Sequence, residues 1–346
     1  MESPVLSLLL KAAINAAPKR VAFINVTAHP LLLELTQQAG ECVLSQTFKP
    51  YILDLDALGL SVSDMQGQSK HAQPNHTQFD LVLLIPSKDK KQSLGWMAQA
   101  FALLNEHGKL MVACENQYGA KSYESALKKL AGQVAASSKR KCRLFSAKKT
   151  ATLNVGLQQQ WLDASQPSLI ESHGLWAQAG LFSWKTADIG SQFLLKHLPV
   201  FQGKGMDLCC GYGLLAAHVL KTSQSITHLH LVEAERSALD CAKKNVADIV
   251  TDDGVVSFHH LDAANENLPR HLNFVVCNPP FHTGQSRDVE LGQTIVNKAC
   301  GALTHGGELY LVANRQLPYE HILKAHLREV ECLAVGDGFK VIRGKK

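Results

Sequence analysis

A predicted strand that ends in an asparagine and two prolines carries the clearest chemical signal in the chain. The apolar run Phe274–Cys277 predicts a short buried strand, and Asn278, Pro279 and Pro280 follow it directly. Proline has no backbone N–H and cannot continue a central strand. The strand therefore ends by presenting a side-chain amide, carbonyls without competing donors and, at Phe281, an aromatic ring.

These groups suit an amino group attached to a planar system. Such a nitrogen is a poor nucleophile because its lone pair is delocalised. The Asn278 side-chain oxygen and the Pro279 carbonyl could hold both N–H groups, while Phe281 stacks on a base. Catalysis would then be mainly orientation and approximation, without a strong general base. The motif specifies a planar nitrogen, and guanine N2, adenine N6 and a glutamine amide all satisfy it.

A second set of residues predicts a nucleoside site. In "MDLCCGYG", Asp207 precedes a turn through Gly211 and Gly213, which lets a ligand approach backbone N–H groups at a helix start. Glu233 ends the next predicted strand, where a carboxylate binds ribose hydroxyls. Asp262 ends the third strand and is placed to meet an adenine amino group. No third glycine follows the turn, which disfavours NAD and favours a smaller nucleoside whose charged amino-acid end Asp207 could reach.

The elements that must position these residues alternate along the second half of the chain. Strands and helices succeed one another, which predicts a parallel sheet with helices on both faces, and two final strands predict an antiparallel pair. The first half repeats the pattern: "FDLVLLIPSKDK" parallels "NFVVCNPPFHTG", and "LNEHGKLMVACE" parallels "LTHGGELYLVAN". We interpret the chain as a duplicated α/β unit whose first copy lacks the glycine turn and the Asn-Pro-Pro sequence. The expected boundaries are 1–155 and 188–346, with 156–187 as the connection.

Composition limits the class of protein. The chain has 346 residues, of which 46% are hydrophobic and 19% charged, and its formal net charge is +5. This is typical of a globular protein with a large core. Nine cysteines without a C-x-x-C pair, and histidines without metal-ligand spacing, disfavour a disulfide framework and a metal site. No apolar run is long enough to span a membrane. We expect a cytoplasmic monomer without metal.

A basic stretch marks a candidate nucleic-acid contact in the first half. The segment 128–149 contains eight lysines and arginines and no acidic residue. Such a field favours phosphate groups, although a solvated face has the same composition. The candidate contacts are Lys139, Arg140, Lys141 and Arg143.

The motifs together resemble a known enzyme family. Asp-x-x-x-Gly-x-Gly, the carboxylate after the second strand and Asn-Pro-Pro-Phe look like a class I S-adenosylmethionine-dependent methyltransferase. "GLFSWKTADIGSQFLL", "GGELYLVAN", "LPY" and "ENQYGAKS" are similar to the bacterial small-subunit rRNA guanine-N2 methyltransferases of the RsmC type, and the similarity spans nearly the full chain. One departure is Cys209, which stands where the Asp-x-Gly-x-Gly form has glycine.

The resemblance implies a fold and a reaction. It implies two Rossmann-like class I methyltransferase domains in tandem, with a degenerate N-terminal copy that docks RNA. It also implies methyl transfer from S-adenosylmethionine to guanine 1207 of 16S rRNA, at the exocyclic N2, on the 30S ribosomal subunit. Three alternatives remain open from the residues alone: an adenine-N6 methyltransferase, a protein glutamine methyltransferase and a non-catalytic RNA-binding assembly factor.

Overall fold

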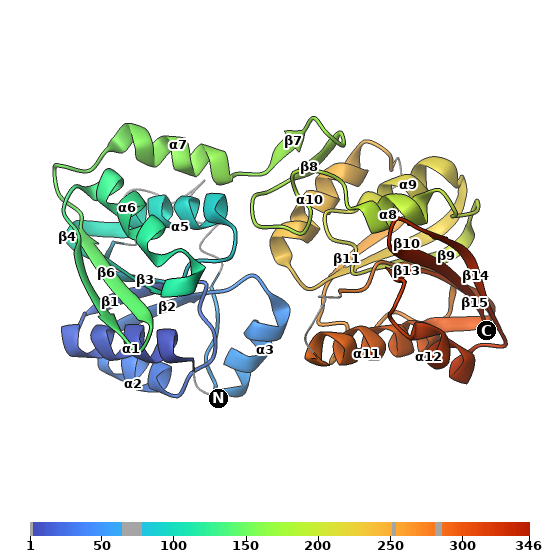
Figure 1. Cartoon of the computed structure of the whole chain (residues 1–346), viewed down its shortest axis with the longest axis horizontal. Coiled ribbons are helices and arrows are strands. Elements are labelled where there is room, and N and C mark those ends of the chain that lie inside the picture. The colour runs from blue at the N-terminus through green and yellow to red at the C-terminus, as the bar shows by residue number, and fades with distance from the viewer. Residues whose placement is uncertain (1–2, 64–77, 251–253, 281–285) are drawn as a thin grey trace. The chain divides into compact units, whose positions relative to one another are not determined.

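The protein consists of two compact units with separate sheets (Figure 1). The computed structural model describes residues 3–63, 78–250, 254–280 and 286–346. Contacts between Cα atoms divide the chain into unit 1, Met1–Gln166, and unit 2, Pro167–Lys346. In each unit helices cover both faces of a mixed sheet, which confirms the predicted fold class.

Unit 1 is built on a six-stranded sheet. Its strands are β1 Arg20–Ile24, β2 Glu41–Ser45, β3 Phe79–Leu84, β4 Leu104–Glu115, β5 Ala135–Lys139 and β6 Cys142–Lys148. Its helices are α1 Pro4–Ala16, α2 Leu31–Gln38, α3 Lys49–Ala57, α5 Lys90–Leu103, α6 Ala120–Ala131 and α7 Val155–Ser165, with a 3₁₀ turn at Asn116–Tyr118. The sheet order is β2-β1-β3-β4-β6-β5, and β6 runs antiparallel to both of its neighbours.

Unit 2 is built on a seven-stranded sheet and a small two-stranded one. Its strands are β7 Ser168–Ile170, β8 Leu175–Ala177, β9 Gln202–Leu208, β10 Ser225–Glu233, β11 Val256–His260, β12 Leu272–Cys277, β13 Leu303–Asn314, β14 Glu329–Gly336 and β15 Phe339–Lys345. Its helices are α8 Ile189–Leu195, α9 Leu214–Thr222, α10 Arg236–Ala247, α11 Ser286–Ala302 and α12 Tyr319–His326. The order is β11-β10-β9-β12-β13-β15-β14, with α11 and α12 on one face and α8, α9 and α10 on the other (Figure 1).

The two units are copies of one architecture. The order β2-β1-β3-β4-β6-β5 reappears as β10-β9-β12-β13-β15-β14. The strands β4 and β13 have the same sequence of buried and exposed positions. Their entry turns also match: His107 N donates to Lys149 O at 3.0 Å, and Gly306 N donates to Lys346 O at 2.9 Å. His107 and Gly306 share a left-handed backbone, with φ of 63° and 78°. Identical turns at equivalent places confirm the predicted duplication.

Strand β9 ends at Leu208 because Cys209 adopts a left-handed φ of 60°. An extended strand cannot pass through that conformation. The terminal hairpin β14–β15 is antiparallel as expected.

The segment 156–187, expected as one connection, is divided between the units. Helix α7 packs along α5, and Gln158 Nε2 donates to Ala98 O at 2.9 Å. The hairpin β7–β8 belongs to unit 2, where the Asn245 side chain of α10 binds both backbone groups of Trp176, at 2.6 and 2.8 Å. Contacts therefore place the boundary between Gln166 and Pro167.

Candidate active site

Residues predicted for the site meet at one edge of the unit 2 sheet. Asp207 lies near the end of β9, Glu233 ends β10, and Asn278 directly follows β12. These three strands are parallel neighbours in the order β10-β9-β12. Their carboxyl ends therefore lie side by side, which is where open α/β sheets bind ligands.

The glycine turn after β9 is open on one side and tightly packed on the other. Gly211 and Gly213 have φ of 55° and 84°. A Cβ at Gly211 would meet no atom of the described residues within 4 Å, whereas one at Gly213 would lie 3.0 Å from the Ala242 Cβ of α10. Gly211 thus leaves its backbone accessible to a ligand, and Gly213 lets α9 begin against α10.

The Glu233 carboxylate joins this turn to the start of α10. One oxygen accepts a hydrogen bond from Gly211 N at 2.8 Å, and the other accepts from Ala234 N and Glu235 N at 2.8 and 2.9 Å. Burial raises the pKa of Glu233 above its usual value, while these backbone donors oppose the rise. The oxygen with a single backbone partner retains acceptor capacity for a ligand hydroxyl.

Asp207 is a buried carboxylate with an unused oxygen. Its side chain has no solvent exposure, and Oδ2 accepts a hydrogen bond from Ala216 N at 2.8 Å. Oδ1 has no partner within the described part of the chain. Burial raises the pKa of Asp207 to about 7. A buried unpaired acceptor is unfavourable by roughly 1–3 kcal/mol, so this oxygen is suited to a cationic or donating group of a ligand.

Asp262 reaches the same edge but is already engaged. It is buried two residues beyond β11. Its two carboxylate oxygens accept hydrogen bonds from Ala264 N at 2.9 Å and from Asn265 Nδ2 at 2.7 Å. Asp262 therefore shapes the loop after β11, and a ligand amino group would use the remaining lone pairs of these oxygens.

Two hydrogen bonds donated by its nitrogen fix the orientation of the Asn278 side-chain amide. Nδ2 donates to Asp188 Oδ2 at 3.0 Å and to Ser191 Oγ at 2.8 Å. The carbonyl oxygen Oδ1 is buried and has no partner among residues that the structure describes. Pro279 is buried beside it, and the predicted ring of Phe281 lies outside the described residues. The arrangement fixes the amide and leaves its acceptor free for a donor such as an amine.

Asp188 and Ser191 were missed as site residues by the sequence analysis. Asp188 is the N-cap of α8, and Ser191 N donates to its carboxylate at 2.7 Å. The spacing Asp188-x-x-Ser191 is an ordinary helix-start signal, which is how the sequence alone would be interpreted. Their contacts with Asn278, which is 90 and 87 positions away, depend on how α8 packs beside β13 and β15.

The equivalent place in unit 1 has an amide where unit 2 has a carboxylate. The pairing of β1 with β2 and of β9 with β10 makes Gln46 the counterpart of Glu233. Gln46 Oε1 keeps the backbone bonds, from Thr47 N at 2.9 Å and Phe48 N at 3.0 Å, but its Nε2 donates to Val26 O at 2.6 Å. The remaining cavity is about 20 Å³, room for a single water rather than a nucleoside.

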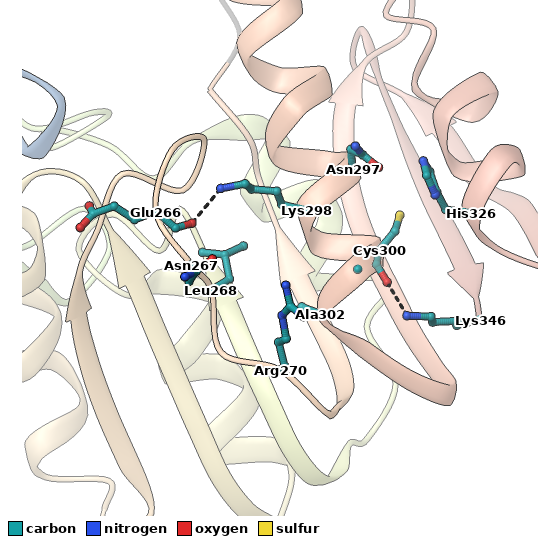
Figure 2. A pocket seen from close by; sticks show the side chains of 11 residues that line it. Glu266, Asn267, Leu268, Arg270, Asn297, Lys298, Cys300, Ala302, His326 and Lys346 are labelled. Atoms are coloured by element: carbon teal, nitrogen blue, oxygen red, sulfur yellow. Dashed lines mark hydrogen bonds between the residues drawn. The ribbon is translucent and has the colours of Figure 1, made fainter.

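A larger cavity of unit 2 lies at the other end of the strands (Figure 2). It has a volume of about 320 Å³ and is lined by residues that come just before β12 and β13, together with His326 and Lys346. Figure 2 shows its two lysines turned to backbone carbonyls: Lys298 Nζ donates to Glu266 O at 2.7 Å and Lys346 Nζ to Cys300 O at 3.2 Å. Because the Asn278 loop follows the opposite end of β12, this cavity is separate from the candidate site.

The predicted basic contacts of unit 1 fall into two groups. Lys139, Arg140 and Lys141 are exposed at the tip of the β5–β6 hairpin. Arg140 and Lys141 have φ of 51° and 62°, a conformation that costs non-glycine residues about 1 kcal/mol or more each. Arg143 is different, because its guanidinium forms an ion pair with Glu124. The hairpin tip is thus the accessible part of the predicted contact.

In 3–63, 78–250, 254–280 and 286–346 no group of three histidine, cysteine or acidic side chains is arranged to hold a metal ion. No helix within those ranges is long and apolar enough to cross a membrane.

Comparisons with known proteins agree over both units. The methyltransferase small domain model matches residues 172–343, and the model of its N-terminal domain matches residues 7–164. Ribosomal RNA small subunit methyltransferase C of Psychromonas ingrahamii is 28% identical over 269 residues, which are 77% of this chain and 76% of that protein. Its namesake in Aliivibrio fischeri (strain ATCC 700601 / ES114) is 29% identical over 272 residues, 78% of each chain.

A solved structure has the same two-unit fold. The T. thermophilus 16S rRNA N2 G1207 methyltransferase (RsmC), in complex with AdoMet and guanosine, superposes with a TM-score of 0.78 at 22% identity. The match covers 100% of this chain and 92% of that one. The described architecture therefore corresponds to a complete tandem fold rather than to a single shared domain.

Proposed function

The chain belongs to the RsmC-type family of small-subunit rRNA methyltransferases, and from this premise we propose its reaction and the roles of its residues. The protein transfers a methyl group from S-adenosylmethionine to the exocyclic N2 of a guanine in 16S rRNA. The solved relative names guanosine 1207, and the same base is the proposed target here. The unpartnered, buried Oδ1 of Asn278 is the observation that carries the proposal.

The chain's residues fit the cofactor that this reaction requires. S-adenosylmethionine supplies a methyl group bound to a positively charged sulfur. Glu233 would accept hydrogen bonds from its ribose, the open side of Gly211 would face its amino-acid part, and Asp207 Oδ1 would bind its ammonium group. Asp262 would meet its adenine amino group.

Asn278 and Pro279 would then aim the substrate amine. Their oxygens accept from the two N–H groups and hold them out of the ring plane, so the lone pair is no longer delocalised into the ring and can point at the methyl group. Asp188 and Ser191 keep the Asn278 amide from turning its nitrogen toward the substrate, which would place donor against donor. Phe281 would stack on the base. In this scheme the chain contributes position and hydrogen-bond geometry, not a strong base.

The class of substrate is tested by where the methyl group goes. Methyl-labelled cofactor is incubated with purified 30S subunits from cells that lack this modification, and RNA and protein are then separated. We expect label in 16S rRNA. Label in ribosomal protein would favour glutamine methylation instead, and no incorporation with intact RNA binding would favour a non-catalytic assembly factor. We further propose that the protein acts as a cytoplasmic monomer without metal.

Cofactor affinity should depend on pH through Asp207. Its pKa is raised to about 7 by burial, so below that pH the carboxyl is mostly protonated and cannot pair with an ammonium group. The amino group of the cofactor, with a pKa near 8, stays charged in this range. Affinity should therefore rise about tenfold from pH 5.5 to pH 7. Calorimetric titration measures this, and Asp207→Asn should flatten the dependence; a flat profile for the unmodified protein would remove Asp207 from the ammonium site.

The hairpin tip of unit 1 is proposed to dock RNA. Lys139→Ala, Arg140→Ala and Lys141→Ala together should weaken 30S binding at low salt and flatten its salt dependence, by roughly 0.7–0.9 of log–log slope per lost phosphate contact. The control removes three exposed lysines of unit 2, Lys196, Lys221 and Lys324. Equal losses in both variants would mean that net charge matters and the tip does not. Arg143 is left in place because its guanidinium is already paired with Glu124.

A further inference from the structure

Tyr319 carries a buried hydroxyl that the scheme above does not use. The residue begins α12 and has no solvent exposure. Its hydroxyl has no hydrogen-bond partner in the described part of unit 2. Burial raises the pKa of Tyr319 to about 12, so the group stays protonated and can donate. An interior donor without an acceptor is unfavourable, so a carbonyl oxygen close to this hydroxyl is a candidate partner.

The Tyr319 hydroxyl lies beside the segment Asn278–Pro280. A Cβ built on Gly292 of α11 would lie 2.1 Å from Tyr319 Oη and 3.4 Å from the Pro280 carbonyl oxygen. The absence of a side chain at Gly292 is therefore what admits the hydroxyl. It also leaves a donor, the Tyr319 hydroxyl, and an acceptor, the Pro280 carbonyl oxygen, around one point.

Unit 1 contains an equivalent tyrosine whose hydroxyl does form a hydrogen bond. Tyr123 of α6 donates to Ser87 O at 3.1 Å. Ser87 is the third residue after β3, and Pro280 is the third residue after β12, the equivalent strand.

The residue after each tyrosine confirms the correspondence. Glu124 pairs with Arg143 of β6, and Glu320 pairs with Lys340 of β15 at 2.6 Å. Arg143 and Lys340 occupy the same position in equivalent strand pairings. The acceptor that corresponds to Ser87 O is therefore Pro280 O.

We propose that Tyr319 is a positioning residue, whose hydroxyl donates to the Pro280 carbonyl when the site is occupied and so fixes the Asn278–Pro280 segment. The segment needs an outside support, because neither proline has an N–H with which to anchor itself. Asp188 and Ser191 hold it through the Asn278 side chain, and Tyr319 holds its backbone. The inference rests on the proposed function for its role in turnover, but the hydrogen bond itself can be tested separately.

Turnover is the first measurement. Tyr319→Phe keeps the ring in the core and removes only the donor. We expect kcat on 30S subunits to fall about tenfold, with KM for cofactor and for subunits changed less than about twofold. The matched control is Tyr123→Phe, which removes the equivalent bond in the unit without the Asn278 site and should leave kcat unchanged. A kcat for Tyr319→Phe within twofold of the unmodified enzyme would overturn the proposal while leaving the proposed function intact.

Gly292 provides a second route to the same bond. Gly292→Ala places a methyl group where the hydroxyl lies and should lower kcat about as much as Tyr319→Phe. In the double variant the clash with the hydroxyl is gone, so its kcat should match that of Tyr319→Phe alone. If the two losses of kcat multiply in the double variant, the two residues act independently and the hydroxyl has no role at the segment Asn278–Pro280.

A readout without RNA separates this inference from the proposed reaction. Thermal unfolding is followed with saturating S-adenosylhomocysteine as the probe. If the hydroxyl donates to Pro280, Tyr319→Phe lowers the melting temperature of the ligand-bound protein. If it stays unpaired, removing it leaves the melting temperature unchanged or raises it, and the proposal fails whatever the substrate proves to be.

Discussion

Replacing Asn278 by alanine should lower the rate of methyl transfer by about 10²–10³ while cofactor affinity changes less than about twofold. The side chain is held by Asp188 and Ser191 with its oxygen directed at no protein donor of the described chain. Removing one preorganised hydrogen-bonding group from an active site typically lowers kcat by about 10²–10³. Single-turnover transfer to 30S subunits measures the rate, and calorimetric titration of S-adenosylmethionine measures the affinity.

Two further variants sharpen this result. Asn297→Ala makes the same chemical change at an exposed asparagine of the cavity at the opposite end of the strands, and it should leave both quantities unchanged. Ser191→Ala removes one of the two bonds that hold the Asn278 amide, and a partial loss of kcat is expected. An equal loss of turnover and of cofactor affinity in Asn278→Ala would place the residue in the cofactor pocket rather than at the amine.

Glu233→Gln should strongly weaken cofactor binding, because it gives unit 2 the residue type that unit 1 has at the equivalent position. Gln46 already occupies the equivalent place, so the amide fits the fold. In unit 2 the NH₂ of the introduced amide would face the N–H of Gly211, so that two donors oppose each other. The charged acceptor for the ribose would also be lost. At roughly 1.5–3 kcal/mol for each bond to a charged group, affinity should fall about 10²-fold. Calorimetric titration of the full chain gives the affinity and the number of sites.

The reverse change in unit 1 is the matched control. The unmodified protein should bind one cofactor per chain, and Gln46→Glu should still bind one, because the cavity there is only about 20 Å³. The Glu233→Gln variant should melt close to the unmodified protein, which separates lost binding from lost folding. A second site in any of these proteins, or unchanged affinity in Glu233→Gln, would contradict the assignment of the cofactor to unit 2.

The parts of the site that sequence could predict are those fixed by strand topology. Asp207, Glu233 and Asn278 each lie at or beside the carboxyl end of a strand, and parallel strands bring those ends to one edge. Alternating elements and the repeated "LNEHGKLMVACE" pattern likewise predict the tandem fold, because burial repeats at the same positions in β4 and β13. Phe281 stays a prediction, since it lies outside the described residues.

The parts that sequence could not predict depend on contacts between distant elements. Asp188 and Tyr319 resemble a helix cap and a core aromatic in sequence, and only the packing of α8 and α12 brings them to the segment Asn278–Pro280. Arg143 belonged to a basic run, and its pairing with Glu124 arises because α6 packs on β6. The segment 156–187 has no clear hydrophobic period, so the sequence alone does not reveal that it is divided between the two units.

The identity of the methylated nucleoside tests the central claim most directly. Subunits lacking the modification are incubated with methyl-labelled cofactor and either the unmodified enzyme or Asn278→Ala, and the 16S rRNA is digested and analysed by mass spectrometry. The account predicts N2-methylguanosine, close to one per subunit, with the unmodified enzyme and only a small fraction of that from the variant over the same time. Label recovered as N6-methyladenosine, or N2-methylguanosine formed equally by Asn278→Ala, would contradict it.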